Sequence, residues 1–295
     1  MGAHIGEDIG LIGLGLVGSA LAWQLLDGGY GVVGCDIDSS RAQALEEMGG
    51  TAVDKPAAVA RRCRRVVLSL MSTDIVRQVV EGENGVLAED QPPAYIIDTT
   101  TGDPEQAAAL GQRLGWLGID YLDATISGSS QQIGQRQGTF MVGGGAEVFA
   151  ANRDLLAVFS DRVYHLGPVG SGSRAKLASN LVLGLNRLAL AEGLVFAGEL
   201  GLDLDAFLEV LKNSPAYSVA VDTKGQRMIE GDFIPESRIR QHLKDVELML
   251  EYARRAGLRL PLSQVHRTLL TEAVAAGDGE LDNAAVIRRL GRGGD

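Results

Sequence analysis

Residues 9–18 read IGLIGLGLVG, and this stretch decides the fold of the N-terminal half. The apolar residues 9–12 suit a short buried strand, and the G-x-G-x-x-G that follows opens a helical pattern. Between a strand and a helix, such glycines form a tight turn, let the backbone approach a pyrophosphate and let the helix pack closely. The free N–H groups at the helix start also favour phosphate. The stretch therefore predicts a dinucleotide-binding loop whose contacts are Gly13, Leu14, Gly15, Leu16, Val17 and Gly18.

Asp36 ends the next apolar run, 32–35, and indicates which dinucleotide binds. A carboxylate at the end of the second strand can accept hydrogen bonds from both ribose hydroxyls of NAD and repels a 2′-phosphate. Arg41 lies five residues further on, close enough to approach a 2′-phosphate, although a guanidinium there is more often a helix-surface charge. The sequence thus favours NAD, with NADP as the alternative.

The alternation of short apolar runs with helical stretches continues to about residue 166. Doubly buried strands spaced by helices are typical of a parallel sheet with βαβ crossovers. We expect strands at 9–14, 32–35, 66–70, 95–97, 121–123 and 139–143, and helices at 20–26, 41–48 and 75–80.

After Gly172 the pattern changes to helices alone. Residues 173–200 contain no proline and predict a helix of about 28 residues that is apolar on nearly every face, as in the middle of a bundle. Further helices are expected at 204–212, 243–256 and 261–276. The predicted fold class is therefore α/β: a Rossmann-type, doubly wound parallel sheet over residues 1–168, joined by the long interdomain helix to an all-α domain over residues 169–295.

Composition excludes several classes of protein. The net charge of −11 repels nucleic acid, and it means that an anionic substrate needs a local patch of donors. The two cysteines and four histidines (His4, His165, His242 and His266) show neither disulfide nor metal-ligand spacing. We expect no signal peptide, and no apolar run of membrane length unbroken by charge stands out. We expect a cytoplasmic protein that binds no metal, nucleic acid or membrane.

Residues 170–180, GSGSRAKLASN, form a second constellation. Lys176 and Asn180 are four residues apart, so on a helix they lie one turn from each other on one face. A lysine can donate a proton to a carbonyl oxygen that becomes an alkoxide and recover it in the reverse direction. Asn180 can hold the same oxygen or orient the lysine. The alternative is a lysine that extends to solvent near the helix start.

Four stretches in this order resemble the β-hydroxyacid dehydrogenase family, which includes 3-hydroxyisobutyrate dehydrogenase and tartronate semialdehyde reductase, with 6-phosphogluconate dehydrogenase as a larger relative. Residues 13–18 resemble its cofactor signature, and 123–128, DATISG, resemble its D-A-P-V-S-G-G motif. Residues 170–180 match G-x-G-x-x-x-K-x-x-x-N, and Lys244-Asp245 resembles a later K-D pair. The resemblance extends from Ile9 to Leu290.

The resemblance implies roles for individual residues. Lys176 would be the general acid/base and Asn180 a substrate contact. Ser127 and Gly128 would bind the substrate carboxylate, and Lys244 would close over nicotinamide and substrate in a cleft between the domains. It also implies cofactor contacts for Leu70, Met71 and Thr101. The expected substrate is a short 3-hydroxy acid or its semialdehyde, with 3-hydroxyisobutyrate-like acids favoured and tartronate semialdehyde as the alternative.

Three residues depart from the family pattern: Thr125 replaces a proline, Ser129 a glycine and Met71 a proline. Ser129 would either narrow the substrate pocket or add a donor to it, whereas Thr125 suits an extended segment. Two other functions stay open, an NADPH-dependent imine reductase on the same scaffold and a non-catalytic NAD-binding module. The apolar interdomain helix further predicts a homo-oligomer, a dimer or a tetramer.

Overall fold

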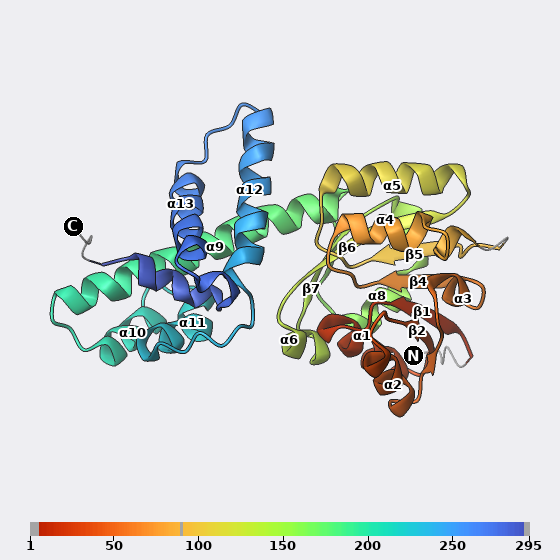
Figure 1. The fold of residues 1–295 in the computed structure, drawn as a ribbon, viewed down its shortest axis with the longest axis horizontal. Helices are drawn as coiled ribbons and strands as arrows, with labels where there is room; N and C mark the ends of the chain where they lie inside the picture. The colour runs from red at the N-terminus through yellow and green to blue at the C-terminus, as the bar shows by residue number, and fades with distance from the viewer. Residues whose placement is uncertain (1–5, 89–90, 292–295) are drawn as a thin grey trace. The chain divides into compact units, whose positions relative to one another are not determined.

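The computed structural model describes residues 6–88 and 91–291 (Figure 1). The chain forms two compact units, Met1–Lys176 and Leu177–Asp295. His4, one of the histidines considered above, lies outside the described residues.

The first unit is built on one eight-stranded sheet in the order β3-β2-β1-β4-β5-β6-β7-β8. The six strands β1 to β6 are parallel, and their order is that of the dinucleotide-binding sheet, so the predicted doubly wound fold is confirmed. The sequence did not predict that β7 would run antiparallel to β6, nor that β8 would extend the sheet beside β7. The strands are β1 (Asp8–Ile12), β2 (Gly31–Cys35), β3 (Thr51–Ala52), β4 (Arg65–Leu68), β5 (Tyr95–Asp98), β6 (Asp120–Ser127), β7 (Thr139–Gly143) and β8 (Val163–His165).

Helices cover both faces of this sheet, so its central strands are buried on both sides, whereas the edge strands β3 and β8 are partly exposed. One core layer includes Leu21 and Leu25 from α1 and Phe159 from α8. The other includes Val76 from α4 and Leu110 from α5, and Figure 1 shows α4 and α5 side by side. The helices are α1 (Leu16–Asp27), α2 (Ser39–Glu47), α3 (Pro56–Ala60), α4 (Thr73–Glu81), α5 (Pro104–Trp116), α6 (Ser130–Gly134), α7 (Ala146–Ala151) and α8 (Arg153–Phe159), with a 3₁₀ turn η1 (Val86–Ala88).

The second unit is helical, as predicted, and continues the helix that starts at Ser171. Its core joins Leu188 and Leu194 of α9 to Leu208, Met249 and Leu270 of the later helices. The helix α11 and the 3₁₀ turns were not predicted. The elements are α9 (Ser171–Glu199), α10 (Leu204–Lys212), α11 (Val219–Glu230), α12 (Ile239–Arg255), α13 (Pro261–Ala275), η2 (Asp278–Glu280) and η3 (Asn283–Arg289).

The prediction that α9 is buried on nearly every face is wrong. Val182 is 56% exposed and Phe196 is 64% exposed, while Leu188 and Leu194 lie in the core. Composition alone cannot separate a core face from an apolar face on the surface, because both raise the hydropathy equally. By length and composition α9 is apolar enough to cross a membrane. One such helix is weak evidence for a membrane span, and one face of α9 packs into the core of the second unit.

Candidate active site

The predicted cofactor and substrate residues of the first unit follow the carboxyl ends of successive parallel strands. Because β1, β2, β4, β5 and β6 are parallel, their carboxyl ends lie at one edge of the sheet, where open α/β sheets bind ligands. The residues at this edge are Gly13–Gly18 after β1, Asp36 after β2, Leu70 after β4, Thr101 after β5 and Ser127 at the end of β6.

The glycine loop has no room for side chains at its two tightest points. A Cβ atom on Gly18 would lie 2.0 Å from the carbonyl oxygen of Gly13, and one on Gly13, where φ is +93°, would lie 2.3 Å from that of Ser69. The helix α1 begins directly after this turn, at Leu16. The N–H groups of its first turn have no partner within the helix, so they can bind an anionic group that the bare backbone admits. The loop therefore fits a dinucleotide pyrophosphate.

Asp36 connects the end of β2 to this loop. One oxygen of its carboxylate accepts a hydrogen bond from the N–H of Leu14 at 2.7 Å, and its side chain is only 6% exposed. The Nη1 atom of Arg41 lies 3.5 Å from the same oxygen and 3.7 Å from the position of a Cβ on Gly15. The structure thus places both residues that bear on cofactor choice beside the glycine loop. From the sequence, we expected Arg41 to be mainly a charge on the helix surface.

The segments after β4 and β5 are hydrogen-bonded to each other. The N–H of Leu70 donates to the hydroxyl of Thr100 at 3.1 Å, and the hydroxyl of Thr99 donates to the last carbonyl of β4 at 2.8 Å. Leu70 and Thr101 are half-buried, whereas Met71 is exposed. The predicted contacts Leu70, Met71 and Thr101 therefore belong to one braced pair of loops.

Beneath these loops lies a buried carboxyl group. Asp98 accepts hydrogen bonds from the N–H of Thr100 at 2.9 Å and from the hydroxyl of Tyr121 at 2.7 Å. Burial raises the pKa of Asp98 to about 6, although these donors oppose the rise. No role for Asp98 was predicted from the sequence, and its contacts show that it stabilises the loop after β5 from within the protein.

The predicted carboxylate-binding segment begins where β6 ends. Ser127 is half-buried, and Ser129 is the N-cap of α6. The Ser129 hydroxyl accepts from the N–H of Gln132 at 3.2 Å, while the Gln132 side chain accepts from the N–H of Ser129 at 2.9 Å. This capping box gives a structural reason for serine in place of the family's glycine. A substrate contact for Ser129 stays a prediction.

The two predicted site residues of α9 differ in exposure. Lys176 is half-buried in the second turn, and Asn180 is 9% exposed one turn later. The amide nitrogen of Asn180 donates to the carboxylate of Asp245 on α12 at 3.2 Å. Lys244, the neighbour of Asp245, is exposed. The Lys-Asp pair thus has one member that orients Asn180, a contact that sequence reasoning missed.

The start of α9 is attached to β6. The two carboxylate oxygens of Asp123 accept from the N–H groups of Gly170 and Ser173, both at 2.7 Å. Burial raises the pKa of Asp123, and these donors oppose the rise. The hydroxyl of Thr125 donates to the carbonyl of Gly172 at 3.0 Å. From the sequence, Asp123 and Thr125 were known only as members of a motif, and these contacts were not predicted. The signal for them was a carboxylate within an apolar strand, because a buried carboxylate needs hydrogen-bond donors nearby.

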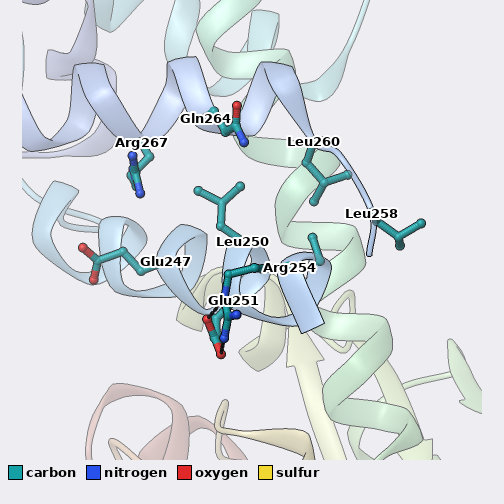
Figure 2. Close-up of a pocket in the computed structure, with 9 residues that line it drawn as sticks. Glu247, Leu250, Glu251, Arg254, Leu258, Leu260, Gln264 and Arg267 are labelled. Carbon is teal, nitrogen blue, oxygen red and sulfur yellow. Dashed lines mark hydrogen bonds and ion pairs between the residues drawn. The ribbon is translucent and has the colours of Figure 1, made fainter. Parts of the chain in front are cut away.

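A hollow of about 320 Å³ lies between α12 and α13 in the second unit (Figure 2). Its wall combines leucines with charged residues, including the ion pair of Arg254 with Glu251 at 2.8 Å. None of the predicted site residues lines it, and we assign it no part in the site.

Comparison with known proteins relates both halves of the chain to dehydrogenases. Residues 8–167 match the family model described as the NAD binding domain of 6-phosphogluconate dehydrogenase. Residues 170–290 match the model described as NAD-binding of NADP-dependent 3-hydroxyisobutyrate dehydrogenase.

Individual relatives cover nearly the whole chain. L-threonate dehydrogenase of Cupriavidus necator is 33% identical, over 96% of this chain and 95% of the relative. The 2-hydroxy-3-oxopropionate reductase of Escherichia coli K12 is 30% identical, over 96% of both. The crystal structure of 3-hydroxyisobutyrate dehydrogenase from Salmonella typhimurium has a TM-score of 0.88 at 26% identity, over 96% of this chain and 100% of that one. An imine reductase from Pseudomonas sp. has a TM-score of 0.65 at 22% identity, over 96% and 99%, and so shares the fold alone.

Proposed function

Because this chain belongs to the β-hydroxyacid dehydrogenase family and is an NAD(P)-dependent oxidoreductase of hydroxy acids or their semialdehydes, we propose that Lys176 is its general acid/base. The observation that carries this proposal is the attachment of α9 to β6. The carboxylate of Asp123 holds the first turn of the Lys176-bearing helix on the strand that ends in Ser127. The helix start that precedes Lys176 is thereby held on β6, whose carboxyl end lies at the same edge of the sheet as the glycine loop.

The cofactor supplies the hydride acceptor in oxidation and the hydride donor in reduction, and the residues present fit it. The first-turn N–H groups of α1 would bind the pyrophosphate, where a Cβ on Gly18 would fill the cradle. During oxidation, the hydroxyl O–H bond of the substrate breaks and the proton goes to the neutral amine of Lys176 as the carbonyl forms. During reduction, the ammonium of Lys176 returns that proton to the oxygen.

The remaining site residues take supporting roles in this proposal. The hydroxyl of Ser127 and the N–H of Gly128 would bind the substrate carboxylate, with Ser129 beside them. Asn180, whose amide is oriented by Asp245, would fix the reacting oxygen. Lys244 would add positive charge for substrate and nicotinamide. A local set of donors of this kind would offset the electrostatic repulsion between an anionic substrate and a chain of net charge −11.

Leu70, Met71 and Thr101 would line the nicotinamide end of the cofactor. Asp36 favours NAD, because its carboxylate lies at the end of β2 beside the loop and would repel a 2′-phosphate. Arg41, beside the same loop, is the residue that would accommodate NADP.

We further propose a short 3-hydroxy acid of the 3-hydroxyisobutyrate type as substrate, with tartronate semialdehyde as the alternative. The relatives named for 3-hydroxyisobutyrate and for 2-hydroxy-3-oxopropionate support this substrate class. We place the enzyme in the cytoplasm as a homo-oligomer, a dimer or a tetramer. The exposed apolar side chains Val182 and Phe196 on α9 support an assembly that covers them.

A substrate panel tests the proposal. Purified protein is assayed with 3-hydroxyisobutyrate, glycerate, L-threonate and the semialdehydes of the first two, each with the matching form of NAD and of NADP. We expect turnover of at least one short 3-hydroxy acid, with NAD preferred. Cofactor binding without turnover of any compound would instead support a non-catalytic NAD-binding module.

A further inference from the structure

We propose that Asp123 and Thr125 are positioning residues, which fix the turn that carries Lys176 against the substrate-binding end of β6. The inference rests on the proposed role of Lys176 and extends it to two residues that do not themselves react.

The alternation of β6 sets the geometry. Side chains two residues apart in a strand point to the same face, so Asp123, Thr125 and Ser127 share one face of β6. The first two make hydrogen bonds to the start of α9. The side chain of Ser127 therefore leaves the strand on the side where the start of α9 lies. The same face of β6 thus bears Ser127, the proposed carboxylate contact, and the two residues that bind the start of the helix that carries Lys176.

Asp123 caps the helix with both oxygens. It is 2% exposed, and it accepts from Gly170 and Ser173, which lie on either side of the helix start at Ser171. N–H groups at a helix start have no partner within the helix, and a negative charge there is favourable. Two short bonds to one carboxylate fix the position and the direction of the first turn.

Gly172 brings this turn directly onto the sheet. A Cβ at Gly172 would lie 2.3 Å from the carbonyl oxygen of Met141 on β7 and 2.5 Å from that of Asp123. The helix backbone therefore rests on the strand backbone with no side chain between them. A small shift of the turn is resisted on one side by this contact and on the other by the two hydrogen bonds of the cap.

Thr125 contacts the backbone carbonyl of Gly172, which is also the helical acceptor for the N–H of Lys176. Thr125 is fully buried, and its hydroxyl donates to the oxygen of Gly172 at 3.0 Å, with the carbonyl of Met141 a more distant acceptor at 3.4 Å. In an α-helix the oxygen of Gly172 also accepts the N–H of the residue four positions later, which is Lys176. The threonine therefore holds the acceptor of the Lys176 N–H. The proline of the resembled motif has no hydroxyl, so this link is a property of the present chain.

The test uses Thr125→Val, which keeps the shape and removes the hydroxyl, with Thr125→Ser to restore it. Hydrogen exchange of the amides at 173–176 is followed by mass spectrometry, a readout that needs no turnover. We expect exchange about fivefold faster in Thr125→Val and near the parent rate in Thr125→Ser. Unchanged exchange in Thr125→Val would overturn the proposed link.

Kinetics separate positioning from mere stability. With 3-hydroxyisobutyrate and NAD⁺, well below the unfolding temperature of the variant, kcat should fall about 10-fold in Thr125→Val while KM changes less than about twofold. The pH profile of kcat should also shift, and Thr125→Ser should restore both. A lower unfolding temperature with unchanged kcat and pH profile would contradict positioning and leave only a structural bond.

Asp123→Asn provides a second variant, and Asp203→Asn is its control, because Asp203 caps α10 through the N–H of Ala206. We expect Asp123→Asn to lower kcat more than Thr125→Val does and Asp203→Asn to leave kcat unchanged. A Lys176→Ala protein that keeps its turnover would refute the proposed function itself. Loss of turnover in Lys176→Ala with unaltered Thr125→Val and Asp123→Asn would refute only the positioning inference.

Discussion

The two units of this protein bury ionisable groups in different surroundings. In the sheet unit the buried groups near the site edge are the carboxyls Asp98 and Asp123, held by backbone and hydroxyl donors. In the helical unit they include the basic groups Arg187 and His266, together with Lys224 and the carboxylate of Asp282. Burial raises the pKa of Asp98 to about 6 and lowers the pKa of His266 to about 4.

The comparison distinguishes buried groups that hold the loops and the helix start of the site, such as Asp98 and Asp123, from buried groups inside a helical core, such as Arg187 and His266. The carboxyls of the first unit lie where strands end and a helix starts, so free N–H groups are available to them. The basic groups of the second unit lie between helices, whose backbone donors and acceptors are already paired. Burial of a polar group is therefore informative about function only together with the place in the fold that it occupies.

The largest effect should come from Lys176→Ala in the sheet unit. Loss of the general acid/base should lower kcat by about 1,000-fold, while the Kd for NADH stays within about twofold of the parent value. Steady-state rates and a fluorescence titration with NADH measure the two quantities. A kcat within tenfold of the parent would remove the lysine from the mechanism.

A glycine in each unit gives the next comparison. A Cβ on Gly18 must displace the carbonyl of Gly13, so Gly18→Ala should raise the Kd for NADH about 100-fold. Gly193 on α9 has open space around its Cβ position, so Gly193→Ala is the control and should leave the Kd unchanged. Equal affinities in the two variants would mean that the glycine loop does not hold the cofactor.

Cofactor choice should respond to a smaller change. Asp36→Asn keeps an oxygen for the Leu14 N–H but loses the charge that repels a 2′-phosphate. The ratio of the Kd for NADP⁺ to that for NAD⁺ should fall about 10-fold. Asp38→Asn removes a neighbouring carboxylate and controls for net charge. A ratio that moves equally in both variants would deny Asp36 a specific role.

Acid should change the stability contributions of His266 and Asp98 in opposite directions. The pKa of His266 is lowered from 6.5 to about 4, so the unfolded chain binds more protons between these values. This group then lowers the free energy of unfolding by about 2 to 3 kcal/mol as the pH falls from 7 to 4.5. The pKa of Asp98 is raised from 3.8 to about 6, so the folded protein binds the extra proton and this group raises stability over the same fall in pH.

Urea unfolding at pH 7 and at pH 4.5 checks these signs. His266→Gln should gain stability relative to the parent at the lower pH, and Asp98→Asn should lose stability relative to it. A shift of the same sign in both variants would contradict the contrast between the units.

The sequence predicted what is local in the chain. The glycine loop, Asp36 after the second strand, and Lys176 one turn before Asn180 all follow from spacing within a few tens of residues. The fold class also followed, because strand and helix periods differ. The predicted helix at 204–212 has the bounds of α10 (Leu204–Lys212).

What the sequence could not predict depends on contacts between distant residues. The bonds of Asp123 to Gly170 and Ser173 span 47 and 50 residues, and that of Asn180 to Asp245 spans 65. The antiparallel pairing of β7 with β6 cannot be predicted from the composition of the two strands. These features are set by tertiary packing, which periodicity does not encode.

Hydride transfer itself is the central claim, and isotope transfer measures it most directly. The protein is incubated with NADH that carries deuterium at both C4 positions and with the semialdehyde of 3-hydroxyisobutyrate, and the product is examined by mass spectrometry and NMR. The account predicts one deuterium on the carbon that bears the new hydroxyl, with a much slower appearance of that label in Lys176→Ala. Cofactor that binds but transfers no deuterium to any semialdehyde of the panel would contradict it.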